Sequence, residues 1–418
     1  MTKPVFLLVE SNTTGTGRQF ARRSAALGIE PVLVTTDPGR YSYAAEDGLR
    51  TELADTSDDR AVLATARRLG RRMCLAGVLS SSEYYVVTAA ATAHALGLPG
   101  PDADAVRGCR NKVRQRQLLV EGAVPVPDFA VARDAGEAVL AAARIGHPVV
   151  LKPAQGSGSL GVRLCADPEA VAAHAAALTA AKANERGLAA SGEILVEEYL
   201  SGAEYSVEVF GHQAVVVVAK RLGPLPDFVE TGHDLPAVLP PPAEARLEEV
   251  AVRAVKALGL GWGAAHVELR MDGDDVRVIE VNPRLAGGMI PELVRRALGV
   301  DLVRDQVALA AGLAPEGRPS GPSRSAAIRF LTAHRPGTLA GAPVLSAALA
   351  AGRTTPGVVA AVLHRGPGER IAPAQDFRGR IGHVIAVADE TAAAAAAAEN
   401  GLAHLAAVLD QQKGPDHP

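Results

Sequence analysis

A short, continuous apolar run at the start of the chain, Val5–Val9, restricts the fold more than any other segment. A strand whose residues are all apolar is typical of a parallel sheet that is covered on both faces. A polar turn, a helical segment that ends at Gly28, and a second apolar run over Pro31–Thr35 follow it. This order predicts a doubly wound α/β unit built on a parallel sheet.

The pattern continues along the chain with a helix at Asp59–Leu69, a strand at Leu75–Leu79 and a helix at Val86–Leu96. The next region is predicted to contain helices at Cys109–Glu121 and Arg246–Leu258, strands at Val149–Lys152, Ile194–Tyr199, Tyr205–Phe210 and Ala214–Ala219, and a hairpin of His266–Met271 and Val276–Val281. A small C-terminal unit with an alanine-rich helix at Asp389–Leu409 follows. We therefore divide the chain into residues 1–108, 109–198, 199–312 and 313–418.

The composition excludes several classes of protein. The formal charge is −3, which offers no basic surface for a nucleic acid. No uninterrupted apolar stretch reaches the roughly 20 residues that a membrane span needs. The three scattered cysteines, Cys74, Cys109 and Cys165, suit a reducing compartment and are expected to be buried. We expect a cytoplasmic protein without nucleic-acid or membrane partners.

A lysine at the end of a strand precedes a loop rich in glycine and serine. Lys152 is followed by the loop Gln155–Gly161, in which Gly156, Ser157, Gly158 and Ser159 could bring backbone and hydroxyl donors close to phosphate oxygens. The loop does not match the Walker A pattern. Lys112, on a basic helix, is the second candidate cation. A flexible hairpin and a solvated helix face are the alternative interpretations of these two segments.

Acidic residues gather on the strands that follow. The segment Glu197, Glu198, Tyr199 and Leu200, with Glu204 beyond it, could present backbone groups to an adenine edge and a carboxylate to a ribose. An ordinary edge strand with surface glutamates would show the same pattern.

The predicted hairpin carries Glu268 on its first strand, and Glu280 and Asn282 on its second. Alternate residues of a strand share a face, so Glu280 and Asn282 point the same way, with Arg284 just beyond. Two carboxylates and an amide oxygen are hard ligands that suit Mg²⁺. Arg284 could clamp a carboxylate or an oxyanion, and Gly287-Gly288 would leave room for a substrate. The alternative is a hairpin held by salt bridges.

Four further residues are candidates for substrate contact. His266 lies two residues before Glu268 and therefore points into the same site, either as a bonded structural histidine or as a substrate ligand. His233 lies in a polar turn and is expected to contact a substrate. Glu230 and Thr231, just before it, could hold an amine.

These blocks, in this order, resemble the ATP-grasp superfamily, and specifically its carboxylate–amine ligases. The resemblance implies a parallel-sheet N-terminal domain, a small mobile lid, an antiparallel-sheet domain for nucleotide and metal, and a C-terminal subdomain. It makes Lys112 and Lys152 the ATP lysines, Gln155–Gly161 the loop over the phosphates and Glu204 the ribose ligand. Glu268, Glu280 and Asn282 become metal ligands, with Lys152 and Arg284 catalytic. One departure is that Asn111, where the family usually has Asp, precedes the first lysine.

The activity that the resemblance implies is ATP-dependent C–N bond formation through an acyl phosphate, with Mg²⁺ or Mn²⁺ as the metal. The segments Glu230–Ala237 and Asn282–Val294 resemble L-amino-acid ligases and related enzymes of natural-product biosynthesis. Small carboxylates and amines are then the partners, and relatives suggest a homodimer. A carboxylase that uses bicarbonate and a nucleotide-like amine is the alternative, and a non-catalytic nucleotide-binding module is a weaker one. An NAD site is disfavoured because Phe20 replaces the third fingerprint glycine.

Overall fold

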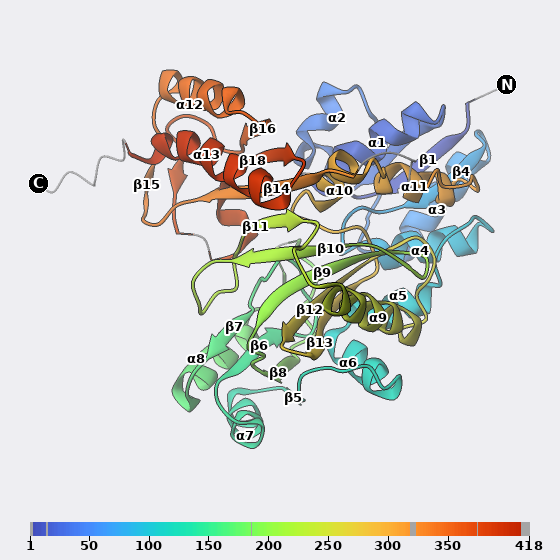
Figure 1. The fold of residues 1–418 in the computed structure, drawn as a ribbon. Helices are drawn as coiled ribbons and strands as arrows, with labels where there is room; N and C mark the ends of the chain where they lie inside the picture. Colours follow the sequence, from blue (N-terminus) through green and yellow to red (C-terminus); the bar gives the residue numbers. More distant parts are fainter. Residues whose placement is uncertain (1–2, 14–15, 185, 318–322, 374, 411–418) are drawn as a thin grey trace, which may run out of the picture.

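A computed structural model of the chain describes residues 3–13, 16–184, 186–317, 323–373 and 375–410 (Figure 1). The N-terminal unit holds a four-stranded parallel sheet in the order β3-β2-β1-β4. Its strands are β1 (Val5–Val9), β2 (Glu30–Thr35), β3 (Arg50–Leu53) and β4 (Leu75–Leu79), and its helices are α1 (Gly17–Ala26), α2 (Ser42–Glu46), α3 (Asp59–Gly70) and α4 (Val86–Ala95). The parallel sheet predicted from the apolar runs is confirmed, whereas Thr14 and Gly15 of the turn after β1 lie outside the described residues.

The single helix predicted over Cys109–Glu121 is wrong, because two helices occupy this region. They are α5 (Ala103–Arg110) and α6 (Lys112–Glu121). Asn111 between them has an extended backbone, and its side chain accepts a hydrogen bond from the backbone N–H of Arg114. This is the geometry of an N-cap, which starts a new helix and ends the preceding one. Lys112 is thereby placed at the first position of α6.

A small antiparallel unit, called here the β5–β8 unit, follows α6. Its sheet has the order β5-β8-β6-β7 and comprises β5 (Phe129–Ala132), β6 (Val149–Pro153), β7 (Arg163–Cys165) and β8 (Ile194–Glu198). Helices α7 (Ala135–Ile145) and α8 (Pro168–Ala180) are capped by Asp134 and Asp167. In Figure 1 this unit lies at the bottom of the molecule, away from the N-terminal unit.

The rest of the chain is organised on one eight-stranded sheet with the order β13-β12-β9-β10-β11-β14-β18-β16. Its strands are β9 (Ala203–Phe210), β10 (Gln213–Leu222), β11 (Glu230–Leu235), β12 (Ala264–Asp272), β13 (Asp275–Asn282), β14 (Ser325–Thr332), β16 (Val358–Leu363) and β18 (Arg380–Ala388). Every neighbouring pair is antiparallel. The last three strands were expected in a separate C-terminal unit. They instead continue the same sheet, across the predicted boundary at residue 312.

Helices cover this sheet, and side-chain alternation decides which face is apolar. Helix α9 (Pro241–Ala257) packs on β9, β10, β12 and β13, where it meets buried Val207, Val217 and Val267. Helices α12 (Ala342–Thr354) and α13 (Thr391–Asp410) pack on the C-terminal strands, and a short pair, β15 (Gly337–Thr338) and β17 (Arg370–Ile371), completes this end. The opposite face of the first strands carries charged side chains.

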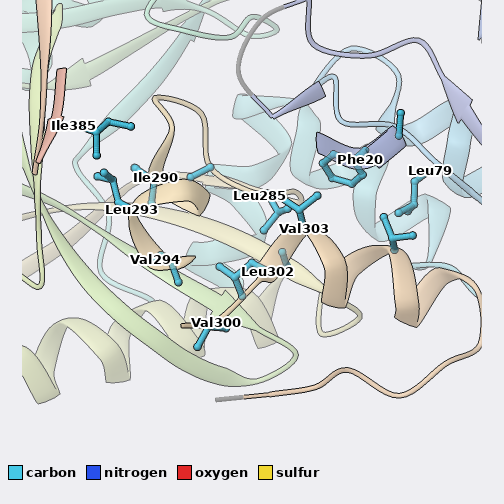
Figure 2. Close-up of a cluster of buried hydrophobic side chains, with 14 of the residues drawn as sticks. Phe20, Leu79, Leu285, Ile290, Leu293, Val294, Val300, Leu302, Val303 and Ile385 are labelled. Carbon is cyan, nitrogen blue, oxygen red and sulfur yellow. The ribbon is translucent and has the colours of Figure 1, made fainter. Parts of the chain in front are cut away.

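Helices α10 (Ile290–Leu298) and α11 (Leu302–Ala310) join the sheet to the N-terminal unit. The contact is a single apolar cluster in which Phe20 of α1 and Leu79 of β4 pack with residues of the two helices and with Ile385 of β18 (Figure 2). Burying several such side chains contributes roughly 1.5–3 kcal/mol each. The cluster therefore holds the N-terminal unit firmly beside the sheet.

The sequence predicts that all three cysteines are buried. Cys109 and Cys165 are buried as expected, but Cys74 is exposed, so the prediction for Cys74 is wrong.

Within the described residues, Thr391–Leu409 of α13 is the one segment long and apolar enough to cross a membrane. One face of it packs against β14, β18 and α12, with Ala394, Ala398 and Leu405 fully buried.

Candidate active site

A cavity of about 1060 Å³ lies where all parts of the molecule meet. Its walls come from the turns after β1 and β4, from the glycine-rich loop after β6, from one face of the eight-stranded sheet and from the segment after β13. All the predicted site residues except Thr231 line it: Lys112, Lys152, Gly156, Ser157, Gly158, Ser159, Glu197, Glu198, Tyr199, Leu200, Glu204, Glu230, His233, His266, Glu268, Glu280, Asn282, Arg284, Gly287 and Gly288. Residues predicted from separate motifs are therefore brought together in one place.

Thr231 is the exception, and a change of register explains it. Strand β11 pairs with β10 through Gly232↔Arg221 and then Glu230↔Leu222, so Thr231 is skipped. Glu230 and His233 both line the cavity, while the Thr231 hydroxyl donates to the Arg221 carbonyl at 3.2 Å. The structure thus places Thr231 away from the site where it was expected to hold an amine.

The two metal-ligand candidates on the hairpin face each other directly. Glu268 of β12 is paired with Glu280 of β13, and the next pair along is Leu269↔Val278. The irregularity between the two pairs is a β-bulge, a device common beside active sites because it re-aims side chains. It allows Val278 and Val281 to be buried in the core while Glu280 and Asn282 line the cavity.

A buried lysine that the sequence interpretation missed lies at the centre of the charged face. The Lys220 ammonium of β10 contacts Glu230 at 2.8 Å, and Glu204 and Glu268 at 3.0 Å each. Burial opposes its charge, but the three carboxylates outweigh burial and raise the pKa of Lys220 well above its ordinary value. In the sequence, the only sign of this role is one lysine after the apolar run Val215–Ala219.

The two predicted ATP lysines are held by acids of the same cavity. The Lys112 ammonium contacts a Glu280 oxygen at 2.7 Å and donates to the Gly156 carbonyl at 3.2 Å, so it links the hairpin to the glycine-rich loop. The Lys152 ammonium contacts Glu197 at 2.5 Å. Glu197 also accepts from Arg116, and although burial opposes its charge, Arg116 and Lys152 lower the pKa of its carboxyl.

An arginine that was not predicted organises the proposed adenine segment. Arg270 of β12 contacts Glu204 at 3.2 Å and donates to the Leu200 carbonyl at 2.7 Å. Its guanidinium lies over the rings of Tyr199 and Phe228, 5.4 and 5.5 Å from their centroids. Glu204 is therefore held between Arg270 and Lys220.

The two histidines differ in their surroundings. His266 is bonded to Glu208 at 2.7 Å and to Glu268 at 3.1 Å, and although burial opposes its charge, these carboxylates raise its pKa to about 10. His266 is thus a satisfied, buried histidine. His233 lies in strand β11 and is fully buried, so its predicted place in a polar turn is wrong. Burial lowers its pKa to about 3, and neither ring nitrogen has a hydrogen-bond partner.

The two glycines after β13, Gly287 and Gly288, differ in how much space surrounds them. A Cβ atom on Gly287 would meet nothing within 4 Å, which agrees with the expectation of open space there. A Cβ atom on Gly288 would lie 2.5 Å from the His233 Nε2 atom, and Gly288 has a φ of +57°. Gly288 therefore lets the chain turn against the His233 ring.

A carboxylate from the N-terminal unit reaches the predicted catalytic arginine. Glu83 lies just after β4 and is 4% exposed, and it forms ion pairs with Arg284 and Arg110. The Asn282 amide, oriented with its nitrogen toward this acid, donates to both Glu83 oxygens at 2.9 and 3.0 Å. Ligands commonly bind at the carboxyl ends of parallel strands. The position of Glu83 just after β4 could therefore have indicated from the sequence that Glu83 lies in the site. The Arg284 guanidinium is thus held at the cavity wall by Glu83 and by the Leu285 carbonyl, to which it donates at 2.8 Å.

The hairpin brings together two carboxylates and an amide oxygen, which are donors of the kind that a divalent ion binds. Like charges directly opposite each other on a sheet are destabilising unless cations compensate them, and Glu268 and Glu280 each have a cationic neighbour. Within the described part of the chain, no three His, Cys, Asp or Glu side chains are grouped so as to hold a metal. An ion held by Glu268, Glu280 and the Asn282 oxygen would need water and phosphate oxygens as further ligands, which is typical of Mg²⁺.

Three family models match the sequence. They are an ATP-grasp N-terminal domain over residues 21–100, an ATP-grasp domain over 145–292 and an L-amino acid ligase C-terminal domain 2 over 329–410. A relative from Sinorhizobium fredii, "Uncharacterized protein y4rH", is 37% identical over 388 residues, which cover 93% of this chain and 80% of that protein. Carnosine synthase 1 of Gallus gallus is 30% identical over 72% of this chain, which spans 34% of that longer protein.

Solved structures show the same fold. The L-amino acid ligase from Bacillus licheniformis superposes with a TM-score of 0.76, at 20% identity, with 98% of each chain covered. This similarity extends over the N-terminal unit, the β5–β8 unit and the eight-stranded sheet together, including the C-terminal strands.

Proposed function

The chain belongs to the ATP-grasp superfamily and is an ATP-dependent ligase, and on that premise we propose that it activates a carboxylate as an acyl phosphate and couples it to an amine, with an amino acid among its substrates. One observation above all supports this reaction. Two lysines, two facing carboxylates and an arginine that pairs with the protein's own Glu83 line a single cavity. Small-molecule carboxylates and amines are accordingly the proposed partners.

In the proposed reaction, a carboxylate oxygen attacks the γ-phosphorus of ATP and the bond to the β-phosphate oxygen breaks, which releases ADP. Transfer of a phosphoryl group depends mainly on positioning and on neutralising charge. Lys112 and Lys152 would bind the phosphates, under the loop that contains Gly156–Ser159. A divalent ion held by Glu268, Glu280 and Asn282 would supply further neutralisation of the phosphate charge.

The amine nitrogen then attacks the acyl carbon, a tetrahedral oxyanion forms, and phosphate leaves as the nitrogen loses a proton. Arg284 would stabilise the oxyanion, because it lies beside Gly287, where the backbone leaves open space. An acyl phosphate hydrolyses in water, so a loop that covers the phosphates would also protect the intermediate. His233 is neutral, neither of its ring nitrogens has a hydrogen-bond partner, and it abuts Gly288 next to this position.

A screen of ADP release over pairs of amino acids, with mass spectrometry of the products, tests the proposed function. We expect ADP and phosphate only when a carboxylate and an amine are both present, with a product whose mass is their sum less one water. A parallel arm replaces the carboxylate with bicarbonate. ADP release with bicarbonate and an amine alone would overturn the proposal and favour the carboxylase.

The hairpin acids give a prediction about the metal. Glu268→Gln is expected to raise the Mg²⁺ concentration needed for half-maximal ADP release by about tenfold or more, because it removes one of two charged ligands. Titration of Mg²⁺ at a fixed ATP concentration measures the shift. Glu249→Gln on the exposed surface of α9 is the matched control. An unchanged Mg²⁺ requirement in Glu268→Gln and in Glu280→Gln would place the ion elsewhere.

A further inference from the structure

The side chains that line the cavity floor change from charged to mainly apolar across the eight-stranded sheet. Strands β13, β12, β9 and β10 present charged groups, whereas β14, β18 and β16 present Phe330, Ile385, Val362 and Ala360 together with an imidazole. The register aligns these residues, because Phe330 pairs with His383 and His383 with Val362, while Ile385 pairs with Ala360 in the next row. The far end of the floor is thus an apolar surface built by the C-terminal strands.

A series of rings connects this surface to the proposed reacting position. Gly288 abuts His233, whose ring lies edge-on to Phe330 with centroids 5.7 Å apart. Phe330 lies edge-on to His383 at 6.4 Å. A molecule whose carboxylate lies at Arg284 and Gly287 would therefore direct its other end along His233 and Phe330 toward His383.

The imidazole of His383 is a polar group placed within apolar surroundings. It is 5% exposed and forms a 3.1 Å hydrogen bond through Nδ1 with the Nε2 atom of His364 at the rim. Burial, with His364 and Arg380 nearby, lowers the pKa of His383 to about 3, so the ring is neutral at pH 7. The proton of the shared bond can reside on either ring, so the second His383 nitrogen can donate or accept toward a ligand.

Arginine side chains line this end of the cavity. The Arg380 guanidinium lies 3.8 Å from the Phe330 centroid and contacts Glu230 at 2.7 Å. Arg365 and Arg378 also line the cavity, with side chains 44% and 55% exposed. Each of these arginines is paired with a carboxylate: Arg380 with Glu230, Arg365 with Glu369 and Arg378 with Asp376. A cationic side chain that entered here would therefore meet arginines and acids that already have cationic partners, whereas a neutral group can pack on Phe330 and bond to His383.

We propose that the surface formed by Phe330, Val362, His383 and Ile385 is the side-chain pocket for the amino acid that is activated, and that it selects neutral side chains with a hydrogen-bonding group over cationic ones. This inference rests on the proposed function. It assigns substrate selection to the C-terminal strands rather than to the ATP-binding half of the sheet.

Hydroxylamine trapping tests the pocket separately from the choice of amine, because hydroxylamine converts any acyl phosphate into a hydroxamate. The wild-type protein is given ATP, Mg²⁺, hydroxylamine and a panel of amino acids. Neutral polar side chains are expected to give the highest kcat/KM, and lysine and arginine the lowest. His383→Leu is expected to lower kcat/KM at least tenfold for neutral polar side chains relative to apolar ones of similar size. His404→Ala, an exposed histidine on α13, is the matched control.

Val362→Phe is a second variant that adds bulk to the pocket without removing a hydrogen bond. It is expected to reduce kcat/KM for large side chains and to spare small ones, with an unchanged Kd for ATP. An equal change for all amino acids in both variants would overturn the pocket while the ligase function stands. A wild-type protein that forms no hydroxamate and releases no ADP with any carboxylate would instead overturn the proposed function.

Discussion

Arg284→Ala is expected to lower kcat by about 10²- to 10³-fold while the affinity for ATP changes little. The guanidinium forms an ion pair with the Glu83 carboxylate, so its position suits a group that carries negative charge on oxygen. In the proposed reaction that charge is greatest in the tetrahedral species, when the amine has attacked the acyl phosphate. An interaction that strengthens only there accelerates turnover without tightening substrate binding.

The fold is expected to tolerate this replacement. Glu83 keeps its contacts with Arg110 and Asn282 when Arg284 is absent, so no buried carboxylate is left without a partner. Steady-state kinetics and calorimetric titration of ATP measure the two quantities, with Arg253→Ala on the surface of α9 as the control. If turnover and ATP affinity fall by the same factor, Arg284 binds the nucleotide and the assigned role is wrong.

The hairpin shows how much of this site the sequence alone could predict. Glu280 and Asn282 stand two residues apart, and local periodicity is enough to place these two on one face. The position of Glu268 opposite Glu280 depends on the strand pairing and its β-bulge. Strands β1, β2 and β4 of the N-terminal unit were predictable for the same reason, since each contains an apolar run. Strand β3, with the sequence RTEL, has no such run and was not predicted. Local patterns of this kind depend only on neighbouring residues.

The features that were missed depend on contacts between distant residues. Lys220 follows an apolar run in β10, and its three acidic partners come from other strands. Glu83 meets Arg284 only because the apolar cluster around Phe20 and Leu293 brings the N-terminal unit against the sheet. The pairing of β11 with β14, which merges the C-terminal strands into the main sheet, likewise joins segments about ninety residues apart. Neither propensity nor periodicity contains this information.

The second large effect is expected for Lys220→Met, which should destabilise the protein by about 3–5 kcal/mol. The lysine side chain is 2% exposed and its ammonium lies within 3.0 Å of three carboxylates. Methionine has a similar shape but no charge, so Glu204, Glu230 and Glu268 would lose a shared cation in a place from which water is largely excluded. Denaturant unfolding measures the loss, and Lys256→Met on the exposed face of α9 should change stability by less than about 0.5 kcal/mol.

The pH dependence distinguishes a lost charge from lost packing. Although burial opposes the charge of Glu230, Lys220 and the cations near it hold the pKa of its carboxyl well below the ordinary 4.5. A carboxyl whose folded-state pKa is depressed contributes stability above its unfolded pKa, and that contribution disappears as the pH falls through the folded value. Lys220→Met removes this contribution, so its deficit relative to the wild type should be largest near neutral pH and shrink below pH 4.5. A deficit that stays constant with pH would mean that the lost charge is not its cause, and the role assigned to Lys220 would be wrong.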